Sequence, residues 1–264
     1  MLCSQQRVEN QNEGFIMDNQ KRGTHRTLQT ILTMGVLLLV FFFQGAVAVV
    51  GNLDELASAV VRGGIIWALV VITAALYLIK YRRLDLLGFL RPDSGSFRQL
   101  YFFIPLIVVA LTSFSCGIDA DNGMGVIFAN LFLTLGIGFC EELYFRGIIC
   151  NLWMEKGERT AVVISSILFA VCHLMNIAGG AGMVETMLQI CFAFVYGIAF
   201  ALIFVVCHSI WPCIILHTFH DFCSFISADG TTLENIALGA IQFIILLCYT
   251  LALIKGRSKS AGPR

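Results

Sequence analysis

Three short motifs place charged or titratable side chains inside segments that are otherwise almost entirely apolar. The first contains Glu141, Glu142 and Arg146, with leucine, tyrosine and phenylalanine between them. A charged side chain at the centre of a bilayer costs about 3 kcal/mol or more unless it is paired, hydrated or faces a cavity. Two adjacent glutamates in such a segment therefore indicate a functional site, with an interfacial charge cluster at the end of a membrane span as the alternative.

The spacing of the first motif separates its two glutamates. On an α-helix, Glu142 and Arg146 are four residues apart with the acid first, which is the favoured order for an ion pair. Glu141 lies about 100° away from Glu142 around the helix axis. We therefore expect Glu142 and Arg146 to pair, and Glu141 to lack a partner on its own helix.

The second and third motifs contain histidines. Phe169 and His173 share one helix face, where a lone histidine is often only a hydrogen-bonded contact between helices. In the third motif, His217 and Asp221 are one helical turn apart and His220 flanks the same face. A carboxylate one turn from an imidazole can hold the ring in one tautomer, so this spacing favours a functional pair.

The elements that carry these motifs are predicted to be membrane helices. The chain has 264 residues, of which 58% are hydrophobic and 13% charged, and its mean hydropathy is +0.84. Charged residues are about 25% of ordinary soluble domains. The composition predicts an all-α, polytopic membrane helical bundle. Its eight candidate spans are 28–50, 62–80, 100–117, 124–152, 160–178, 186–208, 211–228 and 235–254.

The arrangement of basic residues predicts the orientation. Lysines and arginines gather before the first candidate span, after the second, after the fourth and after the eighth. Cytoplasmic loops are enriched in these residues, so both termini are predicted to be cytoplasmic. We divide the chain into a polar N-terminus (1–27), a single transmembrane domain (28–254) with a catalytic core at about 140–225, and a basic tail (255–264). Met17 is an alternative start.

The net charge and the cysteine spacing restrict the kinds of binding partner that we expect. The formal net charge is zero and no basic block indicates nucleic acid binding. The ten cysteines form no Cys-x-x-Cys pair, and most lie in or beside apolar runs, which favours small membrane-buried residues over a metal or disulfide framework. We therefore expect the lipid bilayer and a peptide or protein in or at the membrane as partners, with neither a metal nor another cofactor.

Taken in order, the three motifs resemble those of the CPBP family. This family comprises CAAX proteases and bacteriocin-processing proteins, also called Abi or Rce1-like, which are intramembrane glutamic endopeptidases. The match covers about 140–225. The resemblance implies that Glu141 and His173 activate a water and that His217 with Asp221 stabilises the oxyanion. Glu142 and Arg146 would then be supporting residues, and we place Phe169 and His220 beside them.

The residue types also suit peptide hydrolysis, which needs a base for water and a donor for the developing oxyanion. One position departs from the Rce1-type enzymes, which have asparagine where this chain has Asp221. An ionised carboxylate only accepts hydrogen bonds, so we expect Asp221 to orient or charge His217. A bacterial cell membrane is the expected location, and the substrate, prenylated or not, is left open.

Three alternatives remain at the level of sequence. A metal-dependent protease could use Glu141, His173, His217 and either His220 or Asp221 as zinc ligands, although no His-Glu-x-x-His pair is present. A transporter could use buried titratable groups as a proton relay. A noncatalytic immunity or scaffold protein would use the motifs only to hold its helices together.

Overall fold

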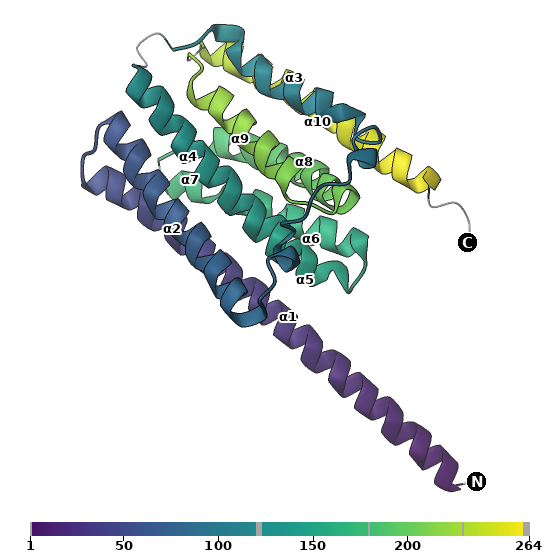
Figure 1. Cartoon of the computed structure of the whole chain (residues 1–264). Helices are drawn as coiled ribbons and strands as arrows, with labels where there is room; N and C mark the ends of the chain where they lie inside the picture. The colour runs from purple at the N-terminus through teal and green to yellow at the C-terminus, as the bar shows by residue number, and fades with distance from the viewer. Residues whose placement is uncertain (1, 120–122, 179, 229, 261–264) are drawn as a thin grey trace. The chain divides into compact units, whose positions relative to one another are not determined.

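The described part of the chain is helical and contains no named strand. A computed structural model describes residues 2–119, 123–178, 180–228 and 230–260 (Figure 1). Six helical segments in these ranges are long and apolar enough to cross a membrane, which confirms the expected all-α membrane bundle. They are Arg22–Val50, Glu55–Tyr81, Met124–Met154, Glu158–Ile177, Met183–Cys207 and Leu233–Arg257.

The chain divides into two compact units, residues 1–37 and residues 38–264. Helix α1 (Leu2–Val50) provides the described residues of the first unit and the start of the second. The long helices α2 (Glu55–Tyr81), α8 (Met183–Cys207) and α10 (Thr232–Ser260) belong to the second unit. All three motifs lie in this second unit.

Two of the expected spans form shorter helices than predicted. The stretch 100–117 contains a 3-10 turn η3 (Tyr101–Phe103), α3 (Ile104–Thr112) and η4 (Ser113–Cys116), and the stretch 211–228 contains α9 (Trp211–Phe225). Pro105 and Pro212 lie at the second position of α3 and α9, where a missing N–H is tolerated. At 1.5 Å per residue, α9 is about 22 Å long, shorter than the hydrocarbon core of about 30 Å.

The fourth stretch forms one continuous helical segment that changes its winding at the first motif. Helix α4 (Met124–Glu142) continues into a π-helix, η5 (Leu143–Cys150), and then into α5 (Asn151–Met154). π-helical segments are rare and occur frequently at functional sites. The two glutamates therefore end a regular α-helix, and Arg146 lies in the wider turn that follows.

Close helix contacts bring the motif-bearing helices together. Helix α4 packs against α2 and α9, and α6 (Glu158–Cys172) packs against α8 (Figure 1). A Cβ atom added at Gly138 would lie 2.6 Å from Thr218 Oγ1, and one at Gly197 would lie 3.0 Å from Ser166 Cα. Small residues let membrane helices approach closely. Gly138 thus allows the first motif to reach the third.

Candidate active site

The expected pair of the first motif is present and fully buried. Arg146 Nε lies 3.1 Å from Glu142 Oε2, and both side chains have 0% exposure. The guanidinium group also lies over the ring of Phe169, 4.6 Å from its centroid, and donates a hydrogen bond from Nη2 to Gly197 O at 3.4 Å. A cation over an aromatic face is attracted by the ring quadrupole. These contacts fix Arg146 between α6 and α8.

The second oxygen of Glu142 contacts the third motif. Glu142 Oε1 lies 2.7 Å from His217 Nδ1. An ionised carboxylate beside an arginine can only accept a hydrogen bond, so Nδ1 of His217 carries the proton that it donates. The sequence pattern predicts that Asp221 orients or charges His217. In the structure Glu142 lies at Nδ1, because α4 and α9 approach closely at Gly138, and Asp221 lies on the Nε2 side of the ring.

The other ring nitrogen of His217 faces two further carboxylates. His217 Nε2 lies 3.5 Å from Asp221 Oδ2 and 3.7 Å from Glu141 Oε2, which are ion-pair separations too long for hydrogen bonds. The side chains of Glu141 and Asp221 are 15% and 22% exposed, whereas that of Glu142 is 0% exposed. Glu141 and Asp221 therefore lie on the accessible side of the cluster, and Glu142 lies on its buried side.

His173 joins this cluster through Phe169. Its Nδ1 lies 3.0 Å from Phe169 O, so Nδ1 carries the proton and Nε2 is left as an acceptor. The ring of Phe169 lies edge-on to the rings of both His173 and His217, with centroid separations of 5.2 and 5.9 Å. Within the described residues, no hydrogen bond or ion pair joins Glu141 to His173.

His220 and one unforeseen residue, Tyr196, complete the surroundings. The ring of His220 lies against Phe192 and Tyr196, and its Nδ1 is buried without a hydrogen-bond partner in the described part of the chain. Tyr196 packs 5.4 Å from the rings of both His217 and His220, and its hydroxyl is likewise buried and unpaired. The sequence signal for Tyr196 was its i,i+4 spacing from Phe192 and Phe200 on α8, which places three aromatic rings on one face.

The positions of the histidine, cysteine, aspartate and glutamate side chains decide whether they can hold a metal ion together. Among the residues that the structure describes, no group of three or more histidine, cysteine, aspartate or glutamate side chains is placed to hold a metal ion. The zinc-ligand set considered from the sequence is therefore not assembled. The chemistry that this site can perform is proton transfer and hydrogen bonding by three carboxylates and two imidazoles, with Arg146 balancing part of the negative charge.

Comparison with known proteins agrees with the resemblance seen in the motifs. Residues 123–223 match the family model described as type II CAAX prenyl endopeptidase Rce1-like. This stretch contains all three motifs, and it confirms the recognition of the CPBP family over that part of the chain. No curated protein and no solved structure matched the chain.

Proposed function

We propose that this chain, whose residues 123–223 match the Rce1-like type II CAAX prenyl endopeptidase family, is an intramembrane endopeptidase that hydrolyses a peptide bond with a water activated by Glu141 and His173. The family match supports a CAAX-type protease. The observation that carries the catalytic assignment is the convergence of Glu141, Glu142 and Asp221 on the single imidazole of His217.

Glu141 and His173 are assigned to the water. The Glu141 carboxylate lies on the accessible side of the cluster, and His173 keeps Nε2 free as an acceptor. The water oxygen attacks the carbonyl carbon of the scissile bond while its proton passes to this pair. When the C–N bond breaks, the same proton is returned to the leaving amine, so the base acts afterwards as the acid.

His217 is assigned to the developing oxyanion. As an imidazolium it donates from Nδ1 to Glu142 and from Nε2 to the carbonyl oxygen as negative charge develops there. Asp221 lies on the Nε2 side, where an ionised carboxylate supports the charged ring and cannot itself donate. Arg146 holds Glu142, and Phe169 separates and supports the two imidazoles. His220, which contacts aromatic rings, is a supporting residue.

The location and domain limits belong to the same proposal. The helices and the family support an integral membrane protein acting on a membrane-associated substrate. We assign both termini to the cytoplasm of a bacterial cell, with a polar N-terminus (1–27), a transmembrane domain (28–254) and a basic tail (255–264). Reporter fusions after residue 27 and residue 254 should both give the cytoplasmic signal. A split result would require an odd number of spans.

The test compares membrane proteomes of cells that express the wild-type chain, Glu141→Ala or His173→Ala at equal abundance. We expect at least one precursor to accumulate in both variants and its shortened form to disappear. The purified wild-type protein should then cleave a synthetic peptide spanning that junction. Identical proteomes, or a junction peptide that the purified protein does not cleave, would refute the protease and favour a noncatalytic scaffold or immunity protein. Proton-coupled uptake by liposomes containing the protein would instead indicate a transporter.

A further inference from the structure

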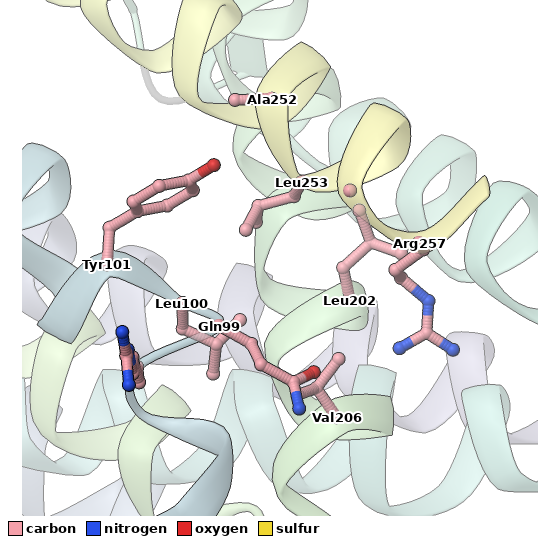
Figure 2. Close-up of a pocket in the computed structure, with 10 residues that line it drawn as sticks. Gln99, Leu100, Tyr101, Leu202, Val206, Ala252, Leu253 and Arg257 are labelled. Atoms are coloured by element: carbon pink, nitrogen blue, oxygen red, sulfur yellow. The ribbon is translucent and has the colours of Figure 1, made fainter. Parts of the chain in front are cut away.

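A second site lies apart from the three motifs, where the ends of α8 and α10 meet the segment that precedes α3. It is a pocket of about 240 Å³ (Figure 2). Its walls include Arg98, Leu100, Tyr101, Leu202, Leu253 and Arg257. None of the motif residues lines it, so the proposed peptidase chemistry does not explain it.

The pocket lies at the level where membrane helices end. Helix α8 ends at Cys207, and the membrane-spanning part of α10 ends at Arg257. Val206 and Arg257, which both line the pocket, therefore belong to the last turns of two apolar helices. Arginine and tyrosine side chains at such helix ends lie among lipid headgroups. The pocket is thus at the boundary between hydrocarbon and water.

The charge of the pocket is positive. Arg98 and Arg257 contribute to its lining, and no aspartate or glutamate does. Arg257 donates from Nη2 to Glu158 Oε2 at 2.6 Å, which leaves its other N–H groups for a second partner. The side chain of Arg98 is exposed and makes no hydrogen bond or ion pair within the described residues, where only its backbone carbonyl accepts a hydrogen bond, from Tyr101 N. The pocket therefore favours an anion, with Arg98 as its uncompensated charge.

The pocket also has apolar lining residues, and the backbone holds its shape. Leu202 and Leu253 lie between Tyr101 and Arg257, and Leu100 lies beside Gln99 (Figure 2). Tyr101 has a φ of 51°, and Leu100 O accepts a hydrogen bond from Tyr249 Oη at 3.1 Å. A left-handed backbone at a non-glycine residue costs about 1–3 kcal/mol and persists where the surroundings enforce it, as they do at ligand clamps.

We propose that this pocket binds the phosphate and glycerol region of an anionic phospholipid. Arg98 and Arg257 contact the phosphate, and Leu100, Leu202 and Leu253 contact the first carbons. A volume of about 240 Å³ is smaller than the roughly 300–1,000 Å³ of pockets that enclose drug-sized ligands. The acyl chains therefore leave the pocket and follow the lipid-facing side of α10, where Leu251 and Ile254 are 56% and 46% exposed.

The test measures which lipid the full-length protein retains. Purified protein in detergent is mixed with equal amounts of phosphatidylglycerol and phosphatidylcholine, and bound lipids are counted by native mass spectrometry. We expect the wild-type chain to retain phosphatidylglycerol preferentially. Arg98→Gln and Arg257→Gln should each lower this preference by about fivefold, the effect of one basic residue near an anionic lipid surface. Arg91→Gln, an exposed arginine outside the pocket, is the matched control and should leave it unchanged.

Two further experiments distinguish the binding of a lipid from the binding of free phosphate. Ala252→Trp fills the apolar part of the pocket and keeps both arginines, so it should abolish lipid retention. Millimolar inorganic phosphate should not displace the lipid. Displacement by phosphate, no preference in the wild-type chain, or an equal loss in Arg91→Gln would each overturn the proposal. If Ala252→Trp fails to fold, as judged by gel filtration, the two arginine variants decide the outcome.

Discussion

Glu142 Oε1 lies 2.7 Å from His217 Nδ1, a buried contact between residues 75 positions apart in the chain. The other oxygen of Glu142 lies 3.1 Å from Arg146 Nε. One carboxylate therefore connects a buried arginine on the π-helix to the imidazole at the centre of the site. Because burying charges is expensive, such an arrangement holds only when each charge keeps its partner. Arg146 thus controls the position of His217 through Glu142.

Arg146→Met should destabilise the protein by about 3–5 kcal/mol, because it leaves the buried Glu142 without its counter-charge. The measurement is thermal or denaturant unfolding of the purified protein in detergent. The double variant Glu142→Gln with Arg146→Met removes both charges and should recover part of this loss. Strictly additive effects of the two substitutions would show that the pair is not coupled.

Glu141→Gln should reduce cleavage by about 10²-fold or more, the usual contribution of a general base. The abundance and unfolding temperature should stay close to those of the wild-type protein, because within the described residues the 3.7 Å contact with His217 is the one ion pair of the Glu141 side chain and no hydrogen bond adds to it. The measurement is the rate of cleavage of the peptide identified by proteomics. Glu185→Gln, an exposed acid at the start of α8, is the control and should cleave normally. Unchanged cleavage by Glu141→Gln would remove Glu141 from the mechanism.

Asp221→Asn should lower the cleavage rate without unfolding the protein, because it removes the carboxylate that lies 3.5 Å from His217 Nε2. Glu142 still fixes the ring through Nδ1 in this variant, so a partial loss is expected rather than a complete one. The measurement is kcat and KM on the same peptide. Retention of full activity would instead assign position 221 to a simple hydrogen-bond donor, which asparagine can supply.

Chelation should leave cleavage unchanged. The described residues contain no group of three metal-ligating side chains in place, and the proposed steps use only carboxylates and imidazoles. The measurement is activity after prolonged dialysis against a strong chelator, together with the zinc content of the purified protein. Loss of activity that zinc restores, with about one zinc per chain, would establish the metal-dependent mechanism that the histidines also permitted.

The sequence predicted contacts within a helix more successfully than contacts between helices. The Glu142–Arg146 pair follows from i,i+4 spacing, and the structure contains it. The same spacing placed Asp221 beside His217, which the structure also shows. The Glu142–His217 contact depends on how closely α4 and α9 pack and on their relative position along the helix axes. No local sequence pattern encodes either of these. For this reason the sequence predicts Asp221 as the carboxylate that orients or charges His217 and predicts Glu142 only as the partner of Arg146.

The lengths and the winding of the helices were also only partly predictable from the sequence. Hydropathy predicts eight spans, but it could not show that α3 and α9 are shorter than the six helices long enough to cross a membrane, because their ends depend on Pro105, Pro212 and the surrounding turns. The amino-acid composition of Leu143–Cys150 does not predict that this segment winds as a π-helix. Tyr196 was missed because a tyrosine between two phenylalanines on one face is typical of an ordinary apolar helix.

Gly138→Ala should weaken both stability and cleavage, because it forces apart the two helices that carry Glu142 and His217. The new Cβ would lie 2.6 Å from Thr218 Oγ1 and 3.1 Å from Thr218 N, so the backbone of α9 must move. Overpacking of this kind costs about 1–3 kcal/mol.

Gly64→Ala on α2 is the matched control, because nothing lies within 4 Å of its added Cβ. It should be neutral or stabilising by up to about 1 kcal/mol, as alanine is the better helix former. Adding Thr218→Ala to Gly138→Ala removes the closest clash, and it breaks no hydrogen bond of Oγ1 in the described part of the chain. The double variant should therefore regain part of the lost activity. Equal behaviour of Gly138→Ala and Gly64→Ala would show that the close approach of α4 and α9 does not set the geometry of the site.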